Sequence, residues 1–155
     1  MRIVTFEGTS LVSKTIGWFT RSGGISHCGV LDDRTNVYYD AKEGVGVRRI
    51  EGRIPGFKGQ KVTIFKFITP IDEWSYKAGI LFLEDQVGKP YDYRSVFKFL
   101  TRRDGTDIDK WFCSEYVARW AEIVKRRLQN KEFWKVSPYD VYSSPIIYPF
   151  EEKIL

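Results

Sequence analysis

The sequence predicts an α+β domain in which a largely antiparallel sheet packs against helices. Short runs rich in β-branched and aromatic residues are separated by turn residues, a pattern typical of an antiparallel meander. Longer segments carry apolar residues at helical spacing. The 155 residues are 43% hydrophobic and 16% aromatic, and neither a repeat nor a linker divides them. A chain of this kind can bury a core, so one domain over residues 1–155 is expected.

The first half of the chain is predicted to supply most of the sheet. Residues 3–6 (IVTF) are expected to form a short strand, followed by a helix from Thr9 to the Gly23-Gly24 pair. Further strands are expected at residues 25–31, 37–41, 46–50 and 61–68.

The second half is predicted to be mainly helical, with helices over residues 72–88, 93–101 and 113–129. The apolar stripe of the first comprises Trp74, Ala78, Leu81 and Val87, and that of the last comprises Val117, Trp120, Ala121, Val124 and Leu128. Residues 137–149 are rich in turn formers and are expected to wrap around the body of the domain.

Charge and composition exclude several classes of protein. The excess of 25 Lys and Arg over 20 Asp and Glu is mild and selects no acidic partner. The basic segments 101–105 and 124–131 lack the interleaved aromatics of a single-strand nucleic-acid platform, so no strong nucleic-acid signal is present. No run approaches the ~20 apolar residues of a membrane span, and the first residues lack the apolar core of a signal peptide. The chain as written is therefore expected to be cytoplasmic.

Cys113, in WFCSEYVARW, stands where the last predicted helix begins. Unpaired backbone N–H groups and the positive end of the helix dipole stabilise a thiolate there and can hold a developing oxyanion. The alternative is a buried structural cysteine, which is the common fate of a free thiol.

His27 is the only histidine, so any Cys–His chemistry has to use it. It lies near the start of a predicted strand, where side chains alternate between the two faces. His27 and Cys28 should therefore point to opposite faces, with Cys28 in the core. That geometry, and the lack of any CxxC or HxxxH spacing, predicts no metal site.

A catalytic histidine needs an orienting partner on its second ring nitrogen. If residues 32–35 form a four-residue hairpin loop, His27 falls opposite Asp40, within reach of a carboxylate–imidazole hydrogen bond. A five-residue loop would turn Asp40 to the other face and would make Glu43 the better candidate.

Four motifs in order, GTSLVSKTIGWFTRSGGISHCGV, YYDAKEGVGVRR, GKPYDY and WFCSEYV, resemble the circularly permuted branch of the NlpC-type, papain-like thiol hydrolases. The resemblance spans about residues 7–145. It implies Cys113 as the nucleophile, His27 as the base and Asp40 as the orienting group, a position where glutamate is frequent. Tyr91 matches a recurrent tyrosine near the active site, either contacting substrate or packing against the cysteine helix. Cys28 stands where a small aliphatic residue is more usual.

The resemblance implies a cysteine peptidase or amidase that works through an acyl-enzyme and needs neither a metal nor an organic cofactor. Its substrate would be a peptide or acyl amide, with peptidoglycan peptides as the leading class. Release by lysis or carriage by a phage would suit that substrate in a chain without an export signal. Two alternatives stay open: a lipid-directed thiol acyltransferase or hydrolase, and a non-catalytic binding module on the same fold. The sequence does not distinguish amide from ester cleavage.

Overall fold

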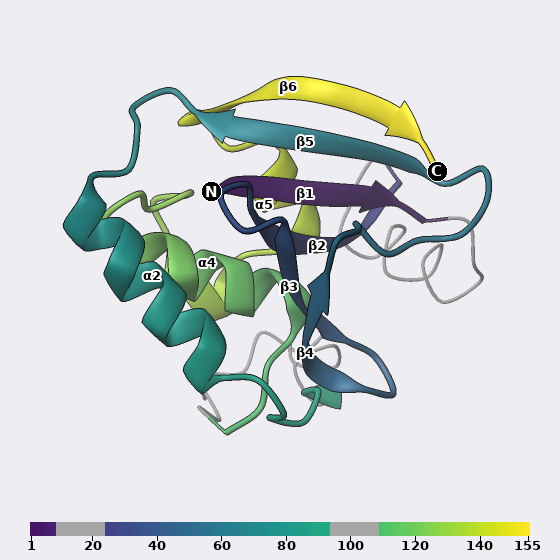
Figure 1. Cartoon of the computed structure of the whole chain (residues 1–155), viewed down its shortest axis with the longest axis horizontal. Helices are drawn as coiled ribbons and strands as arrows, with labels where there is room; N and C mark the ends of the chain where they lie inside the picture. The colour runs from purple at the N-terminus through teal and green to yellow at the C-terminus, as the bar shows by residue number, and fades with distance from the viewer. Residues whose placement is uncertain (9–23, 94–108) are drawn as a thin grey trace.

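The computed structural model of the protein describes residues 1–8, 24–93 and 109–155 (Figure 1). The helix expected from Thr9 onward and nearly all of the one expected at 93–101 lie outside these residues. The strands are β1 (Arg2–Glu7), β2 (Ile25–Asp32), β3 (Val37–Lys42), β4 (Gly46–Glu51), β5 (Lys61–Phe67) and β6 (Ile147–Ile154). The helices are α2 (Glu73–Asp85), α4 (Cys113–Ile123), α5 (Pro138–Tyr142) and the short 3-10 helix η1 (Phe133–Lys135).

The six described strands form one antiparallel sheet in the order β4-β3-β2-β1-β5-β6. The predicted meander is confirmed, since β2, β3 and β4 are consecutive neighbours. The strand expected at 61–68 is also present, but β5 pairs with β1 and not with β4. This crossover makes β1 a central strand, which explains why its apolar side chains are buried on both faces. The α+β class is thus confirmed.

The larger of two apolar clusters lies between the sheet and the helices, where Ile3, Val30 and Phe65 meet α4. All five residues of the stripe predicted for α4 are buried. The smaller cluster covers the other face of the sheet and contains Val4, Phe6 and Tyr38. A cluster on each face fixes which side of every strand points toward the helices.

The stripe predicted for α2 faces the wrong way. Trp74 is 85% exposed and Leu81 is 70% exposed, whereas the buried side of the helix is formed by Ser75, Gly79 and Leu83. The reason is close approach to α4, beside which α2 lies in Figure 1. A Cβ atom added at Gly79 would come within 2.5 Å of Val124 Cγ1. Gly79 therefore allows the close approach, and Trp74 and Leu81 are left outside.

The C-terminal part of the chain corrects two further expectations. Helix α4 ends at Ile123, six residues early, because Lys125 adopts a left-handed φ of 57° and the Arg126 N–H closes the turn on the Ala121 carbonyl. Residues 147–154 form β6, which begins inside the segment 137–149 expected to be a turn-rich wrap. As an edge strand β6 is mostly exposed, so it lacks the apolar alternation that marks a buried strand.

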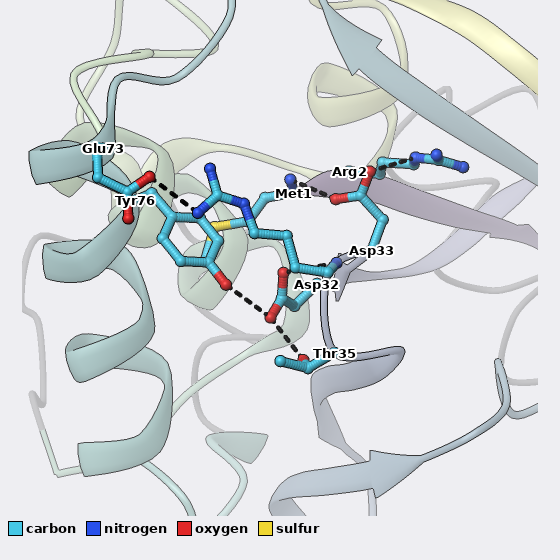
Figure 2. Close-up of polar contacts among 8 residues, drawn as sticks. Met1, Arg2, Asp32, Asp33, Thr35, Glu73 and Tyr76 are labelled. Atoms are coloured by element: carbon cyan, nitrogen blue, oxygen red, sulfur yellow. Dashed lines mark hydrogen bonds and ion pairs between the residues drawn. The ribbon is translucent and has the colours of Figure 1, made fainter.

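A buried carboxylate ties the β2–β3 hairpin to α2 (Figure 2). Asp32, fully buried, accepts hydrogen bonds from the Thr35 hydroxyl at 2.6 Å and the Tyr76 hydroxyl at 3.0 Å. The main-chain N–H of Arg34 donates to its other oxygen. These contacts hold the turn at residues 33–36 and so fix the register of the hairpin that carries the candidate site.

Among the helices in the described ranges, none is long and apolar enough to cross a membrane.

Candidate active site

Cys113 is the first residue of α4, as predicted. The preceding Phe112 is extended and buried, and the Ser114 hydroxyl donates to the Val136 carbonyl at 2.5 Å. These contacts anchor the helix start from both sides. The main-chain N–H groups of the first turn have no acceptor within the helix, so they point toward whatever lies beyond Cys113.

His27 lies on β2 with its side chain on the face of the sheet opposite the helices. Its ring packs against Phe6 of the smaller cluster, with the ring centres 5.4 Å apart, and its Nε2 lies 2.7 Å from Asp40 Oδ2. Cys28, next along the strand, is fully buried in the cluster beneath α4. The expectation that these neighbours face opposite sides is met.

The thiol of Cys113 meets side chains from both faces because it lies at the edge of β2. The β2–β3 ladder runs only from the Asp32–Val37 pair to the Val30–Tyr39 pair. Beyond it, the main chain and the thiol of Cys28 lie close enough to the Cys113 sulfur to lower its pKa. His27 is also near enough to that sulfur for the two groups to shift each other's pKa. Since Asp40 holds Nε2, the ring nitrogen left for Cys113 is Nδ1.

These contacts set the charges of the pair. Burial by itself would raise the pKa of the Cys113 thiol, but hydrogen bonds from Cys28 and His27, with the imidazolium charge, lower that pKa to about 5. Burial would lower the pKa of His27, yet hydrogen bonds to Asp40 and Cys113 raise it to about 9. Between these two values the pair is a thiolate facing an imidazolium.

Asp40 reaches His27 through a register different from the expected one. The hairpin loop has four residues, as supposed, but spans 33–36, so Asp40 lies diagonally across from His27 and not directly opposite it. The shift is two positions along β3, and the side-chain period of a strand is two, so Asp40 keeps the expected face. Glu43, the alternative, lies beyond the end of β3 and lines the adjacent cleft.

Arg48 is a member of the site that sequence reasoning missed. It pairs with Asp40 across the β3–β4 hairpin, with Nε 2.6 Å from Oδ1 and a terminal nitrogen 3.0 Å from Oδ2. Burial would raise the pKa of Asp40, but His27 and Arg48 lower it to about 2. The sequence signal was the short KEGV turn, which places residues 40 and 48 opposite each other.

His27 opens onto a cleft of about 520 Å³, whereas Cys113 is only 1% exposed and does not line that cleft. Tyr91 does line it, and its ring packs edge-on against Phe112 with centres 5.9 Å apart. A β-bridge between Tyr91 and Trp111 fixes the backbone there. Tyr91 thus both lines the cleft and packs at the start of α4, so a substrate carbonyl reaches the sulfur only if cleft side chains turn aside.

Two tryptophans and a basic segment lie outside the site. Trp111 is buried in the core and Trp74 is exposed, so neither forms an apolar cleft wall. The basic segment 124–131 is largely engaged within the fold: Arg126 donates to the Thr69 and Pro70 carbonyls, and Lys131 pairs with Asp140.

No protein-family model and no curated protein matches the sequence. A solved structure does match the fold: one described as the metalloprotein yiiX from Escherichia coli O157:H7, DUF1105. The two superpose with a TM-score of 0.67 over 99% of this chain and 97% of that one, at 18% identity. At that identity the likeness shows a shared fold and nothing about activity.

Proposed function

We propose that this protein is a cysteine hydrolase with a permuted papain-like fold that cleaves amide bonds through an acyl-enzyme. The observation that carries the proposal is the contact between Cys113 and His27, made across the strand edge while Asp40 holds the other ring nitrogen. A nucleophile, a base and an orienting carboxylate in this order are what covalent acyl transfer requires.

The reaction begins from the thiolate–imidazolium pair. The Cys113 sulfur attacks the substrate carbonyl, and N–H groups at the start of α4 stabilise the oxyanion. His27 then gives its proton to the leaving nitrogen, and the C–N bond breaks. Neutral His27 next takes a proton from water, whose oxygen displaces the sulfur to release the acid. Asp40 keeps the ring oriented, and Arg48 keeps Asp40 ionised.

The residues fit a metal poorly, although the yiiX structure is described as that of a metalloprotein. The Arg48 guanidinium already contacts both oxygens of Asp40, so a cation bound there would lie beside a permanent positive charge. Nor do the described ranges of the chain hold three or more His, Cys, Asp or Glu side chains gathered as a metal site. No step of the mechanism therefore runs through a metal.

The same chemistry would act on an ester, so the lipid-directed acyltransferase or hydrolase is the second candidate. The cleft supports it only in part, since Phe6, Ile54 and Phe57 form an apolar wall beside charged residues such as Arg53. Peptide amides, including those of peptidoglycan, remain the first choice. A non-catalytic binding module would gain nothing from the ionisation of a buried thiol, so that alternative does not explain the lowered pKa of Cys113.

The proposal is tested by the pH dependence of alkylation of Cys113 with iodoacetamide, followed by mass spectrometry. The rate constant should rise through a midpoint near pH 5, because the lowered pKa leaves the thiolate present above that pH. In His27→Ala the midpoint should move above pH 8, toward that of an ordinary thiol. Cys28 is an internal control: burial raises its pKa well above normal, so it should react far more slowly.

Turnover then separates the candidates. Peptide amides and acyl-lipid esters are screened with wild type and Cys113→Ala, and hydrolysis should disappear in the variant. The turnover rate should rise with a midpoint near pH 5, where Cys113 loses its proton, and fall with a midpoint near pH 9. The fall is expected because His27 donates a proton only below its raised pKa. An alkylation midpoint near pH 8.5 in wild type, unmoved by removal of His27, would refute the proposed pair.

A further inference from the structure

Cys28 is a buried thiol that the hydrolytic mechanism does not consume. It is fully buried, belongs to the same apolar cluster as Cys113, and is reduced in this structure, as is Cys113. It lies on β2, which packs against α4, and it is close enough to the Cys113 thiol for each of the two to shift the pKa of the other. Two thiols from segments far apart in the sequence thus lie close together in one buried cluster at the nucleophile.

From this proximity we propose that Cys113 and Cys28 form a reversible disulfide when the protein meets a peroxide, with Cys28 as the resolving thiol. The disulfide needs only the pair of sulfurs. Its consequence, loss of activity with recovery on reduction, rests on the proposed function.

The first step is oxidation of Cys113. Its thiolate attacks one oxygen of hydrogen peroxide, the O–O bond breaks, and an S–O bond forms to give the sulfenic acid. The departing hydroxide takes the proton of the His27 imidazolium and leaves as water. Thiolate reactivity selects Cys113 for this step, since Cys28 keeps its proton.

The second step closes the disulfide. The Cys28 sulfur attacks the sulfenic sulfur, the S–O bond breaks, and the Cys28 proton leaves with the hydroxide as a second water. One peroxide is thereby reduced to two waters as two thiols are oxidised to one disulfide. Burial keeps Cys28 protonated first of all, and the charge on Cys113 adds to this effect. Oxidation to a neutral sulfenic acid removes that charge, which makes Cys28 the better nucleophile when it is needed.

The proximity also protects the nucleophile. A sulfenic acid left alone is oxidised further to the sulfinic acid, which ordinary thiols do not reverse. With Cys28 already close by, closure competes directly with a second peroxide, which has to enter a site where Cys113 is only 1% exposed.

The test treats the full chain with hydrogen peroxide at pH 7 and follows intact mass without reductant. The expected product is about 2 Da lighter, contains no free thiol, and returns to the starting mass with dithiothreitol. Alkylation of Cys113 by iodoacetamide should fall roughly tenfold or more on oxidation and recover on reduction. Peptide mapping should join the peptides that contain Cys28 and Cys113.

Two variants at position 28 serve as matched controls. Cys28→Ser keeps a hydroxyl donor for the Cys113 sulfur, and Cys28→Val keeps an apolar side chain of similar size if serine unfolds the core. Either should gain oxygen at Cys113, about 32 Da on full treatment, and should not recover with dithiothreitol. The proposal is overturned if wild type gains oxygen without losing about 2 Da, or if the variants recover as wild type does. Absence of alkylation in untreated wild type would instead defeat the proposed function.

Discussion

Two aspartates of the β2–β3 hairpin, Asp32 and Asp40, are both fully buried carboxylates, yet they do different things. Asp32, at the turn, accepts hydrogen bonds from the hydroxyls of Thr35 and Tyr76 and from the main-chain N–H of Arg34 (Figure 2). Asp40, near the other end of the hairpin, contacts an imidazole and a guanidinium.

The difference lies in the partners. Donors that stay neutral satisfy a buried carboxylate and hold it still, so Asp32 serves the turn and its contact with α2. A titratable partner couples the carboxylate to another group, so Asp40 raises the pKa of His27, which in turn helps to lower that of Cys113. Burial alone therefore does not mark a functional carboxylate; the chemistry of its donors does.

The largest effect should come from Asp40→Asn. Losing the carboxylate lowers the pKa of His27, so at pH 7 the ring is neutral and Cys113 holds its proton more firmly. Alkylation of Cys113 by iodoacetamide at pH 7 should slow roughly 10- to 100-fold, with the pH midpoint moved upward. A rate within a factor of about two of wild type would mean that Asp40 has the same structural role as Asp32.

Asp32→Asn is the reciprocal change and should act on stability. The amide retains one acceptor oxygen and turns an NH₂ group toward donors, so unfolding free energy should fall by about 2 kcal/mol in urea titrations. The alkylation rate of the folded variant should stay within a factor of about two of wild type. A large loss of thiol reactivity in a stable Asp32→Asn protein would contradict the comparison.

The smallest effect should come from Tyr76→Phe, which removes one of the donors to Asp32 and keeps the ring that packs under Arg34. Because the Thr35 hydroxyl and the Arg34 N–H remain, a loss of only about 1 kcal/mol is expected in the same titrations. Asp40 is untouched, so the pH profile of Cys113 should overlay that of wild type. A shifted profile would show that the two ends of the hairpin are coupled.

Local patterns predicted the elements well where each element buries one regular face. The strands of the β2–β3–β4 meander, strand β5 and the start of α4 at Cys113 were predicted in this way, and β1 was found from its short run of β-branched and aromatic residues although both of its faces are buried. Prediction failed where a neighbouring element, or the lack of one, changed which side chains are buried. Gly79 lets α2 approach α4 closely and turns Trp74 outward, and the edge position of β6 removes the alternation that would have marked it as a strand.

The candidate site divides in the same way. Residue identity and side-chain period predicted three features: the lone histidine, the cysteine at a helix start, and the face of β3 on which Asp40 lies. Each of these is a property of one segment or one hairpin. The tertiary structure decided the rest: the crossover that places β5 beside β1, the end of the β2–β3 ladder that brings Cys113 to the edge of β2, and the contact of Cys113 with both Cys28 and His27. Such contacts join segments that are far apart in the chain. Which segments meet depends on how the whole core packs, and a local sequence pattern does not determine that packing.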